Sequence, residues 1–219
     1  MARPSLARGL YAITDQQLIP EGELGKRVGE AIDGGAVIIQ YRDKSSARAA
    51  RLEQATVLAS LCRARNVPLI INDDVELACS VSADGVHLGI DDDSVRAARA
   101  QLGADAIIGV SCYNQLARAQ DAVAAGADYV AFGRFFASNT KPNAVTADIE
   151  LLVDARHQLQ VPIVAIGGIT SDNGGALIAA GADCLAAIDG IFGTTDIRAA
   201  AQRYAALFTA GSDSFERRS

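Results

Sequence analysis

The feature that most constrains the fold is an alternation of short apolar runs with longer alanine-rich stretches. The runs are rich in β-branched residues and apolar almost throughout, which is typical of parallel strands buried on both faces. The intervening stretches, such as Arg48–Arg65 and Leu116–Ala125, have helical character. Eight strands are predicted: Leu10–Thr14, Val37–Tyr41, Pro68–Asn72, Gly85–Leu88, Ile107–Ser111, Tyr129–Phe132, Ile163–Ile166 and Cys184–Ile188.

A weak internal repeat indicates how these units close. The tripeptide Gly-Ala-Asp follows a helical stretch and precedes a strand at residues 103, 126 and 181, where a glycine can end the helix with positive φ. Eight units in 219 residues leave about 27 residues per unit, which fits a compact βα repeat. We therefore predict an α/β fold, a single-domain (β/α)8 TIM barrel over residues 1–210, followed by a polar, disordered tail at 211–219. An open doubly wound sheet is the alternative, but the first turn, Thr14–Gln17, lacks its glycine fingerprint.

Composition excludes several classes of function. A formal charge of −6 and a pI near 4.9 disfavour binding to nucleic acid or to an anionic membrane. No apolar run reaches the roughly 18 residues that a membrane span needs. The N-terminal residues lack the continuous apolar region of a secretory signal, so none is predicted. The four cysteines have neither metal-ligand nor disulfide spacing, and two histidines are too few for a His-rich zinc site. A cytoplasmic protein with reduced thiols is expected.

In a barrel, chemistry belongs at the C-terminal ends of the strands. Strand 2 ends in Gln40, Arg42 and Lys44, which share one face of an extended chain and suit an anionic ligand. A solvated strand end is the alternative, although a lysine near a helix N-terminus opposes the helix dipole. Carboxylates follow the next two strands, at Asn72-Asp73-Asp74 and at Asp91–Asp93. They could form ion pairs, cap helices or hold Mg²⁺, and the spacing leaves this open.

The later strand ends offer groups for phosphate. Ser111 ends strand 5 with no His or Asp nearby in the sequence, so a hydrogen-bonding role is predicted rather than a nucleophilic one. The long loop after strand 6, residues 133–142, carries two hydroxyl groups and two cations. Gly167-Gly168 follows strand 7 and Asp189-Gly190 follows strand 8, where barrels commonly bind phosphate.

Taken together, these segments resemble the thiamine phosphate synthase family over nearly the whole chain. The specific matches are Gln40-x-Arg42-x-Lys44, Ile71-Asn72-Asp73, Asp84-Gly85-Val86-His87-Leu88-Gly89, Thr140-Lys141 and Ala165-Ile166-Gly167-Gly168-Ile169. The resemblance implies a transferase of thiamine biosynthesis that joins 4-amino-2-methyl-5-hydroxymethylpyrimidine diphosphate to 4-methyl-5-(2-phosphoethyl)thiazole. The implied products are thiamine phosphate and pyrophosphate, formed by a dissociative mechanism with Mg²⁺ on the leaving diphosphate.

The resemblance also assigns roles to individual residues. It implies pyrimidine-diphosphate contacts from Gln40, Arg42, Lys44, Asn72, Ser111 and Lys141, of which Arg42, Lys44 and Lys141 are catalytic. It implies Mg²⁺ ligands at Asp73 and Asp92, and thiazole-phosphate contacts from Ser138, Thr140, Gly168, Ile188 and Asp189.

The chain departs from the family pattern at four positions. Arg134 and Ala137 replace prolines, Ser138 replaces a threonine, and Asp189 puts a carboxylate near a phosphate site. A related thiazole tautomerase and a catalytically silent phospho-ligand-binding barrel are the alternatives. His87 is the only candidate for the base that a tautomerase would need. It lies late in its strand, where it is better explained as a residue that orders the barrel. Small-molecule partners are implied, while the oligomeric state is left open.

Overall fold

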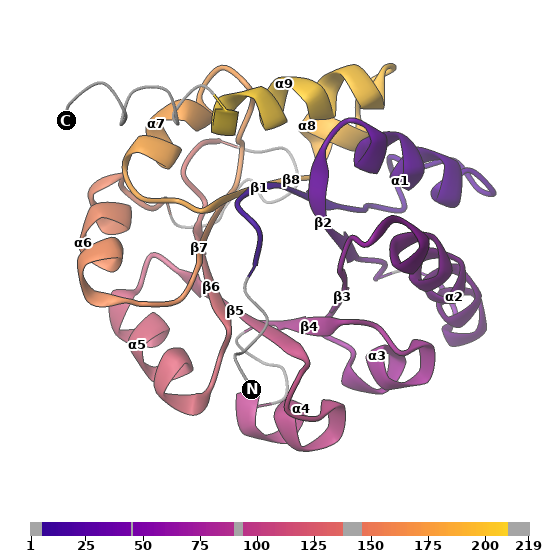
Figure 1. Cartoon of the computed structure of the whole chain (residues 1–219), viewed down its shortest axis with the longest axis horizontal. Coiled ribbons are helices and arrows are strands. Elements are labelled where there is room, and N and C mark those ends of the chain that lie inside the picture. The colour runs from indigo at the N-terminus through magenta and orange to yellow at the C-terminus, as the bar shows by residue number, and fades with distance from the viewer. Residues whose placement is uncertain (1–5, 45, 90–93, 138–145, 210–219) are drawn as a thin grey trace.

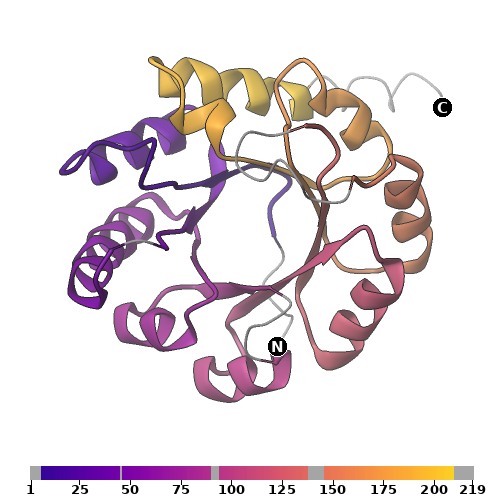
Figure 2. The ribbon, with the colours of Figure 1, turned by 180° about the vertical axis from the view of Figure 1, so that it is seen from behind.

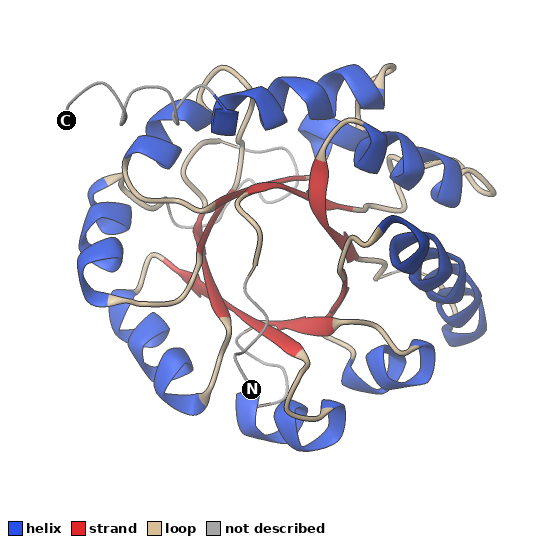
Figure 3. Cartoon of the chain, viewed as in Figure 1, coloured by secondary structure: helices blue, strands red, loops and turns tan. Residues whose placement is uncertain are grey.

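The structure is a computed structural model that describes residues 6–44, 46–89, 94–137 and 146–209. Eight parallel strands form a closed barrel in which each strand pairs with its neighbour in sequence and β1 pairs with β8. Figures 1 and 2 show the helices as an outer ring, and Figure 3 shows the strands enclosed by it. The predicted (β/α)8 barrel is confirmed. The proposed tail, residues 211–219, lies outside the described residues.

The strands match their predicted positions closely. They are β1 Gly9–Ile13, β2 Ala36–Tyr41, β3 Leu69–Asn72, β4 Gly85–Leu88, β5 Ile107–Tyr113, β6 Tyr129–Gly133, β7 Ile163–Ile166 and β8 Cys184–Ala187. The helices are α1 Leu24–Asp33, α2 Arg48–Arg65, α3 Val75–Val81, α4 Val95–Leu102, α5 Leu116–Ala125, α6 Glu150–Gln158, α7 Gly174–Ala179, α8 Asp189–Phe192 and α9 Ile197–Thr209. No helix in the described ranges is long and apolar enough to cross a membrane.

The Gly-Ala-Asp repeat found in the sequence stabilises the N-terminal end of the barrel. Gly103, Gly126 and Gly181 have φ of 91°, 104° and 119°, as the helix-ending role requires. In two of these repeats, the aspartate two residues after the glycine also accepts a hydrogen bond from the backbone of the neighbouring strand. Asp128 Oδ2 accepts from the backbone N–H of Ile108 at 2.8 Å, and Asp183 Oδ2 accepts from that of Ile163 at 2.9 Å. The repeat therefore serves structure at the end of the barrel opposite to the strand ends that carry chemistry.

Two apolar layers support the strand ends. The larger lies between the strands and the surrounding helices, and the smaller fills the barrel interior. The interior holds two large polar aromatics, Tyr11 and Tyr129, each at most 1% exposed. Gly109 makes room for one of them, since a Cβ there would lie 1.9 Å from Cζ of Tyr129. Buried hydroxyl groups need partners, and the partners of these two lie toward the C-terminal end of the barrel.

Candidate active site

A cavity of about 340 Å³ opens at the C-terminal ends of the strands. All eight strands contribute to its lining, as expected for the functional end of a barrel. The predicted site residues that line it are Gln40, Arg42, Asn72, Ser111, Gly168, Ile188 and Asp189. Lys44 and Asp73 are not among its lining residues, although each follows a strand that contributes a lining residue, Gln40 of β2 or Asn72 of β3. The predicted positions Asp92, Ser138, Thr140 and Lys141 lie outside the described residues.

Arg42 is held in place by the two residues that follow β1, Thr14 and Asp15. Its Nη1 atom donates to Asp15 Oδ2 at 3.0 Å, and its backbone N–H donates to Thr14 Oγ1 at 2.9 Å. Asp15 is 7% exposed and also accepts from the backbone N–H of Gln17 at 2.9 Å. A buried carboxylate that holds a guanidinium fixes the direction in which the guanidinium points. The sequence motifs predicted Arg42 as a site residue but gave no role to Asp15, which is 27 residues away in the sequence.

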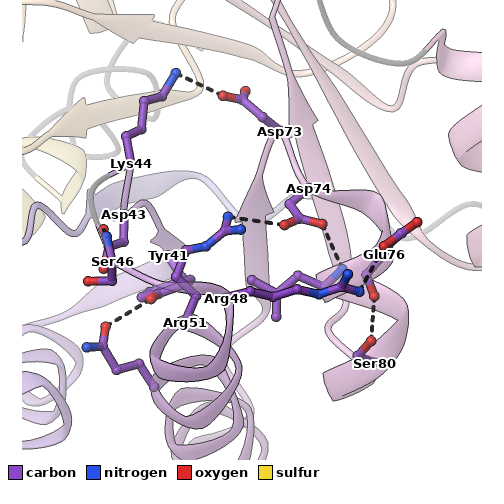
Figure 4. Close-up of polar contacts among 12 residues, drawn as sticks. Tyr41, Asp43, Lys44, Ser46, Arg48, Arg51, Asp73, Asp74, Glu76 and Ser80 are labelled. Atoms are coloured by element: carbon purple, nitrogen blue, oxygen red, sulfur yellow. Dashed lines mark hydrogen bonds and ion pairs between the residues drawn. The ribbon is translucent and has the colours of Figure 1, made fainter.

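Lys44 and Asp73 meet across the strand ends. Figure 4 shows the lysine side chain reaching Asp73, with 3.0 Å between Nζ and Oδ2. Asp73 has φ of 64°, a left-handed conformation that is uncommon for a residue other than glycine. Such strain often marks functional positions. The predicted cation and carboxylate therefore lie together next to the cavity.

The neighbouring aspartate has a structural role instead. Asp74 Oδ1 caps α3 by accepting from the backbone N–H of Leu77 at 2.9 Å, while its Oδ2 pairs with Arg51 of α2 at 3.1 Å (Figure 4). At the next helix, α4, the cap is Ser94, whose Oγ accepts from the backbone N–H of Ala97 at 3.2 Å. Asp91–Asp93, for which capping was one of the open readings, lie outside the described residues.

Ser111 corrects one sequence inference. It was predicted to have no His or Asp nearby, yet its Oγ lies 2.9 Å from Nε2 of His87. The two residues are 24 apart in sequence but lie on adjacent parallel strands. This is still no catalytic triad, because Nδ1 of His87 contacts the hydroxyl of Tyr129 at 2.8 Å rather than a carboxylate. The expectation that His87 orders the barrel agrees with these contacts.

The interior tyrosines continue this contact to the other side of the cavity. The hydroxyl groups of Tyr129 and Tyr11 lie 2.8 Å apart, and Gln40 Nε2 donates to Tyr11 at 2.8 Å. Burial raises the pKa of both phenols well above the ordinary value, so both stay neutral. The sequence motifs did not reveal this connection, since its two tyrosines are 118 residues apart.

The turn after β7 is built from two glycines. Gly167 and Gly168 have φ of 102° and 62°, and a Cβ on Gly168 would lie 2.3 Å from the backbone oxygen of Ala137. The backbone N–H of Phe136 donates to the Gly167 oxygen at 3.0 Å, so the start of the loop after β6 lies directly on this turn. Within the described ranges, the backbone N–H groups of Gly168 and Ile169 have no hydrogen-bond acceptor. They suit an anionic ligand.

Asp189 begins the short helix α8, and its Oδ1 lies close to Gly193 at the other end of that helix. Arg134 and Asp189 both depart from the family pattern and could have compensated for each other by pairing, but the described ion pairs include none between these two residues. Asp189 does not act as an N-cap either, because it is the first residue of α8, and the N-cap residue Ile188 makes no side-chain hydrogen bond. The carboxylate is exposed and turned toward Gly193, which favours the orientation away from a bound phosphate.

The cysteines do not take part in this site. Cys62, Cys112 and Cys184 are buried, and burial raises the pKa of each thiol to about 12. Cys79 is exposed and lies on α3, a helix that contributes no residue to the cavity lining. The described part of the chain also contains no group of three or more His, Cys, Asp or Glu side chains able to hold a metal alone.

A closed parallel barrel with a guanidinium and a glycine turn lining its C-terminal cavity, and an ammonium–carboxylate pair beside it, is the architecture of an α/β-barrel enzyme that acts on small molecules. The family model described as thiamine monophosphate synthase matches residues 10–191. The chain belongs to the thiamine monophosphate synthase family, as its motifs indicated.

Individual relatives agree with this assignment. The chain is 55% identical to the thiamine-phosphate synthase of Nitrosococcus oceani over 91% of its own length and 92% of the relative's. It is 53% identical to that of Azoarcus sp., over 92% and 97% of the two chains. The solved thiamine phosphate pyrophosphorylase from Pyrococcus furiosus superposes with a TM-score of 0.83 at 34% identity, covering 92% and 96%. Family membership at this level makes the chain an enzyme of the transferase class.

Proposed function

We propose that this chain condenses 4-amino-2-methyl-5-hydroxymethylpyrimidine diphosphate with 4-methyl-5-(2-phosphoethyl)thiazole, releasing thiamine phosphate and pyrophosphate. One observation carries the proposal: a single cavity is lined both by the predicted pyrimidine contacts and by the predicted thiazole-phosphate turn. Two substrates that must react with each other need such a shared cavity. A cytoplasmic location and the absence of nucleic-acid partners fit the acidic composition.

The diphosphate side is formed by β2 and β3. Arg42, Lys44 and Asn72 bind the pyrimidine diphosphate, with Gln40 and Ser111 on the ring. Arg42 and Lys44, together with Lys141, neutralise the charge that develops on the diphosphate as its bond to the methylene carbon breaks. Because the bond breaks before the thiazole nitrogen attacks, no protein nucleophile is needed. The Ser111–His87 pair is accordingly a hydrogen-bonding pair.

The residues present fit a Mg²⁺ ion. Mg²⁺ is usually held by one or two carboxylates together with substrate phosphates, so a complete protein cage is not required. Asp73 offers a strained, partly exposed carboxylate beside Lys44, and Asp92 would supply the second. When bound, the ion would neutralise negative charge on the leaving diphosphate.

The thiazole side is formed by the ends of β7 and β8. The backbone N–H groups around Gly168 receive the thiazole phosphate, with the chain at Ile188 and Asp189 beside them. Ser138 and Thr140 complete the contacts from the loop after β6. Holding this phosphate directs the thiazole nitrogen toward the methylene carbon of the pyrimidine.

A product assay tests this proposal against its alternatives. Purified protein is incubated with both substrates and Mg²⁺, and thiamine phosphate and pyrophosphate are quantified. We expect equal amounts of the two products, formed only when both substrates are present. Conversion of thiazole phosphate alone to an isomer would indicate the tautomerase. Binding of either phosphorylated substrate without any product would indicate a silent barrel.

The role of Asp73 is tested by Asp73→Asn. The amide keeps the size of the side chain but lacks the charge that a hard cation prefers. We expect the Mg²⁺ concentration for half-maximal rate to rise about tenfold or more, with part of the activity returning at high Mg²⁺. Glu76→Gln is the matched control, because Glu76 pairs with Arg48 in solvent. An unchanged Mg²⁺ dependence in Asp73→Asn would remove this residue from the metal site.

The orientation of Asp189 is tested by Asp189→Ser. With its carboxylate turned toward Gly193, the aspartate adds little repulsion to a phosphate at the glycine turn. We expect the KM for thiazole phosphate to change by no more than about twofold at saturating pyrimidine diphosphate. A decrease of about tenfold or more, which corresponds to ~1.4 kcal/mol, would mean that the carboxylate faces the phosphate.

A further inference from the structure

Two side chains outside the cavity lining bind the turn after β7. Asn173 directly precedes α7, and Tyr204 lies on α9, the helix beside α7 (Figure 1). The turn residues Gly168, Ile169 and Thr170 all line the cavity, whereas Asn173 and Tyr204 do not. The two side chains therefore contact the turn from the side that faces away from the cavity.

The amide of Asn173 makes two hydrogen bonds with this turn. Its Nδ2 donates to the backbone oxygen of Gly168 at 3.0 Å, and its Oδ1 accepts from the backbone N–H of Thr170 at 2.8 Å. These partners fix the orientation of the amide, because a carbonyl oxygen only accepts and an N–H only donates. An asparagine at the start of a helix usually caps that helix, but the side chain of Asn173 makes no such bond with α7. Its side chain therefore serves the turn rather than the helix.

Tyr204 binds the next carbonyl group of the turn. Its hydroxyl donates to the backbone oxygen of Ile169 at 2.7 Å, and the residue is buried. Burial raises the pKa of Tyr204 to about 12, so the hydroxyl keeps the proton that it donates. Gly190 leaves the space for this contact, since a Cβ there would lie 2.2 Å from the Tyr204 hydroxyl oxygen. The hydroxyl thus lies between the turn after β7 and the short helix α8.

The bound carbonyl groups determine where the N–H groups of the turn point, because the C=O and the N–H of a trans peptide point in opposite directions. The Gly167 oxygen accepts from the backbone N–H of Phe136. The Gly168 oxygen accepts from Asn173. The N–H groups on the opposite edges of these two peptides belong to Gly168 and Ile169, the two that have no acceptor within the described ranges. Since Phe136 and Asn173 lie outside the cavity lining, these two N–H groups point to the cavity side.

We propose that Asn173 and Tyr204 are positioning residues that hold the backbone N–H groups of Gly168 and Ile169 toward the phosphate of the thiazole substrate. This inference rests on the proposed function. A turn that contains two glycines can rotate its peptides easily unless other groups hold them. Asn173 prevents the Gly168–Ile169 peptide from turning over, and Tyr204 fixes the peptide that follows it. Loss of either side chain should therefore weaken phosphate binding more than it slows the chemical step.

The alcohol 4-methyl-5-(2-hydroxyethyl)thiazole separates phosphate binding from simple packing. It carries the same ring as the substrate but no phosphate, so it competes for the ring site without using the turn. At saturating pyrimidine diphosphate and Mg²⁺, formation of thiamine phosphate gives both the KM for thiazole phosphate and the inhibition constant of the alcohol. The ratio of this inhibition constant to the KM measures how much the phosphate contributes to binding.

Asn173→Ala should raise the KM for thiazole phosphate about tenfold, because a hydrogen bond from the turn to a charged group is weakened. The inhibition constant of the alcohol, kcat and the KM for the pyrimidine diphosphate should each change by no more than about twofold. Tyr204→Phe keeps the aromatic ring in the core and should raise the KM for thiazole phosphate about fivefold. It decides the matter if Asn173→Ala does not fold. A merely structural role would instead raise the KM and the inhibition constant alike.

The matched control is Tyr41→Phe. Tyr41 is also buried, but its hydroxyl donates to Gln54 of α2 at 2.9 Å, away from the turn. Its ratio should equal that of the wild-type protein. The proposed role is overturned if folded Asn173→Ala or Tyr204→Phe keeps the wild-type ratio, or if Tyr41→Phe lowers it equally. A wild-type protein that makes thiamine phosphate but binds the alcohol as tightly as the phosphate would overturn this role alone. If the wild-type protein makes no thiamine phosphate, the proposed function fails, and the positioning role fails with it.

Discussion

Replacing Arg42 by methionine should lower kcat/KM for the pyrimidine diphosphate by about 10²- to 10³-fold. Methionine keeps much of the length and volume of the side chain but removes a charge that is held ready by Asp15 at 3.0 Å. Loss of one preorganised group that stabilises developing charge has an effect of this size. Steady-state kinetics with each substrate varied in turn should show kcat falling more than KM rises.

Asp15→Asn provides the control for Arg42. This change leaves the guanidinium in place but removes the carboxylate that directs it, so we expect a smaller loss of about tenfold. Melting curves should accompany both variants, because Arg42→Met leaves the Asp15 carboxylate without its cation at a cost of roughly 1–3 kcal/mol. If folded Arg42→Met keeps kcat near the wild-type value, Arg42 has no part in the departure of the diphosphate.

Gly168→Ala should raise the KM for thiazole phosphate by at least about tenfold. The new Cβ would lie 2.3 Å from the Ala137 oxygen and 2.7 Å from the Phe136 oxygen, so the loop after β6 must move away from the turn. An alanine at φ of 62° also adds backbone strain of about 1 kcal/mol. The KM for the pyrimidine diphosphate should change less, because most of its proposed contacts lie at the ends of β2 and β3, away from this turn.

Gly175→Ala is the matched control for this glycine. Gly175 lies on α7, seven residues further along the chain, and nothing lies within 4 Å of the position of its Cβ. The change should leave both KM values unaltered and slightly raise the melting temperature, since alanine favours a helix. Equal KM values for thiazole phosphate in Gly168→Ala and the wild-type protein would show that this turn does not bind the phosphate.

The fold was predictable because its signals are local. Strands buried on both faces are apolar runs, and each repeat ends a helix with a glycine, so β4 and β7 were found with their observed bounds. The position of the site followed from the fold, since parallel strands bring their C-terminal ends together. Gln40, Arg42 and Ser111 could therefore be expected at one cavity before any coordinates were considered.

The contacts that hold the site residues were not predictable in the same way. Ser111 and His87 are partners because β4 and β5 are adjacent, although the sequence separates them by 24 residues. The Tyr11–Tyr129 contact crosses the barrel, and neither strand indicates which residue on the far side it will meet. Side-chain contacts between distant strands depend on register and on space such as that left by Gly109, which a motif does not encode.

The most direct test of this account is a crystal structure of the protein with thiamine phosphate, pyrophosphate and Mg²⁺. We predict pyrophosphate in contact with Arg42 and Lys44, with the metal on Asp73. We predict the phosphate of thiamine phosphate at the backbone of Gly168, and its pyrimidine ring between Gln40 and Ser111. Pyrophosphate bound away from Arg42, or a thiamine phosphate whose phosphate does not touch the turn after β7, would contradict the account.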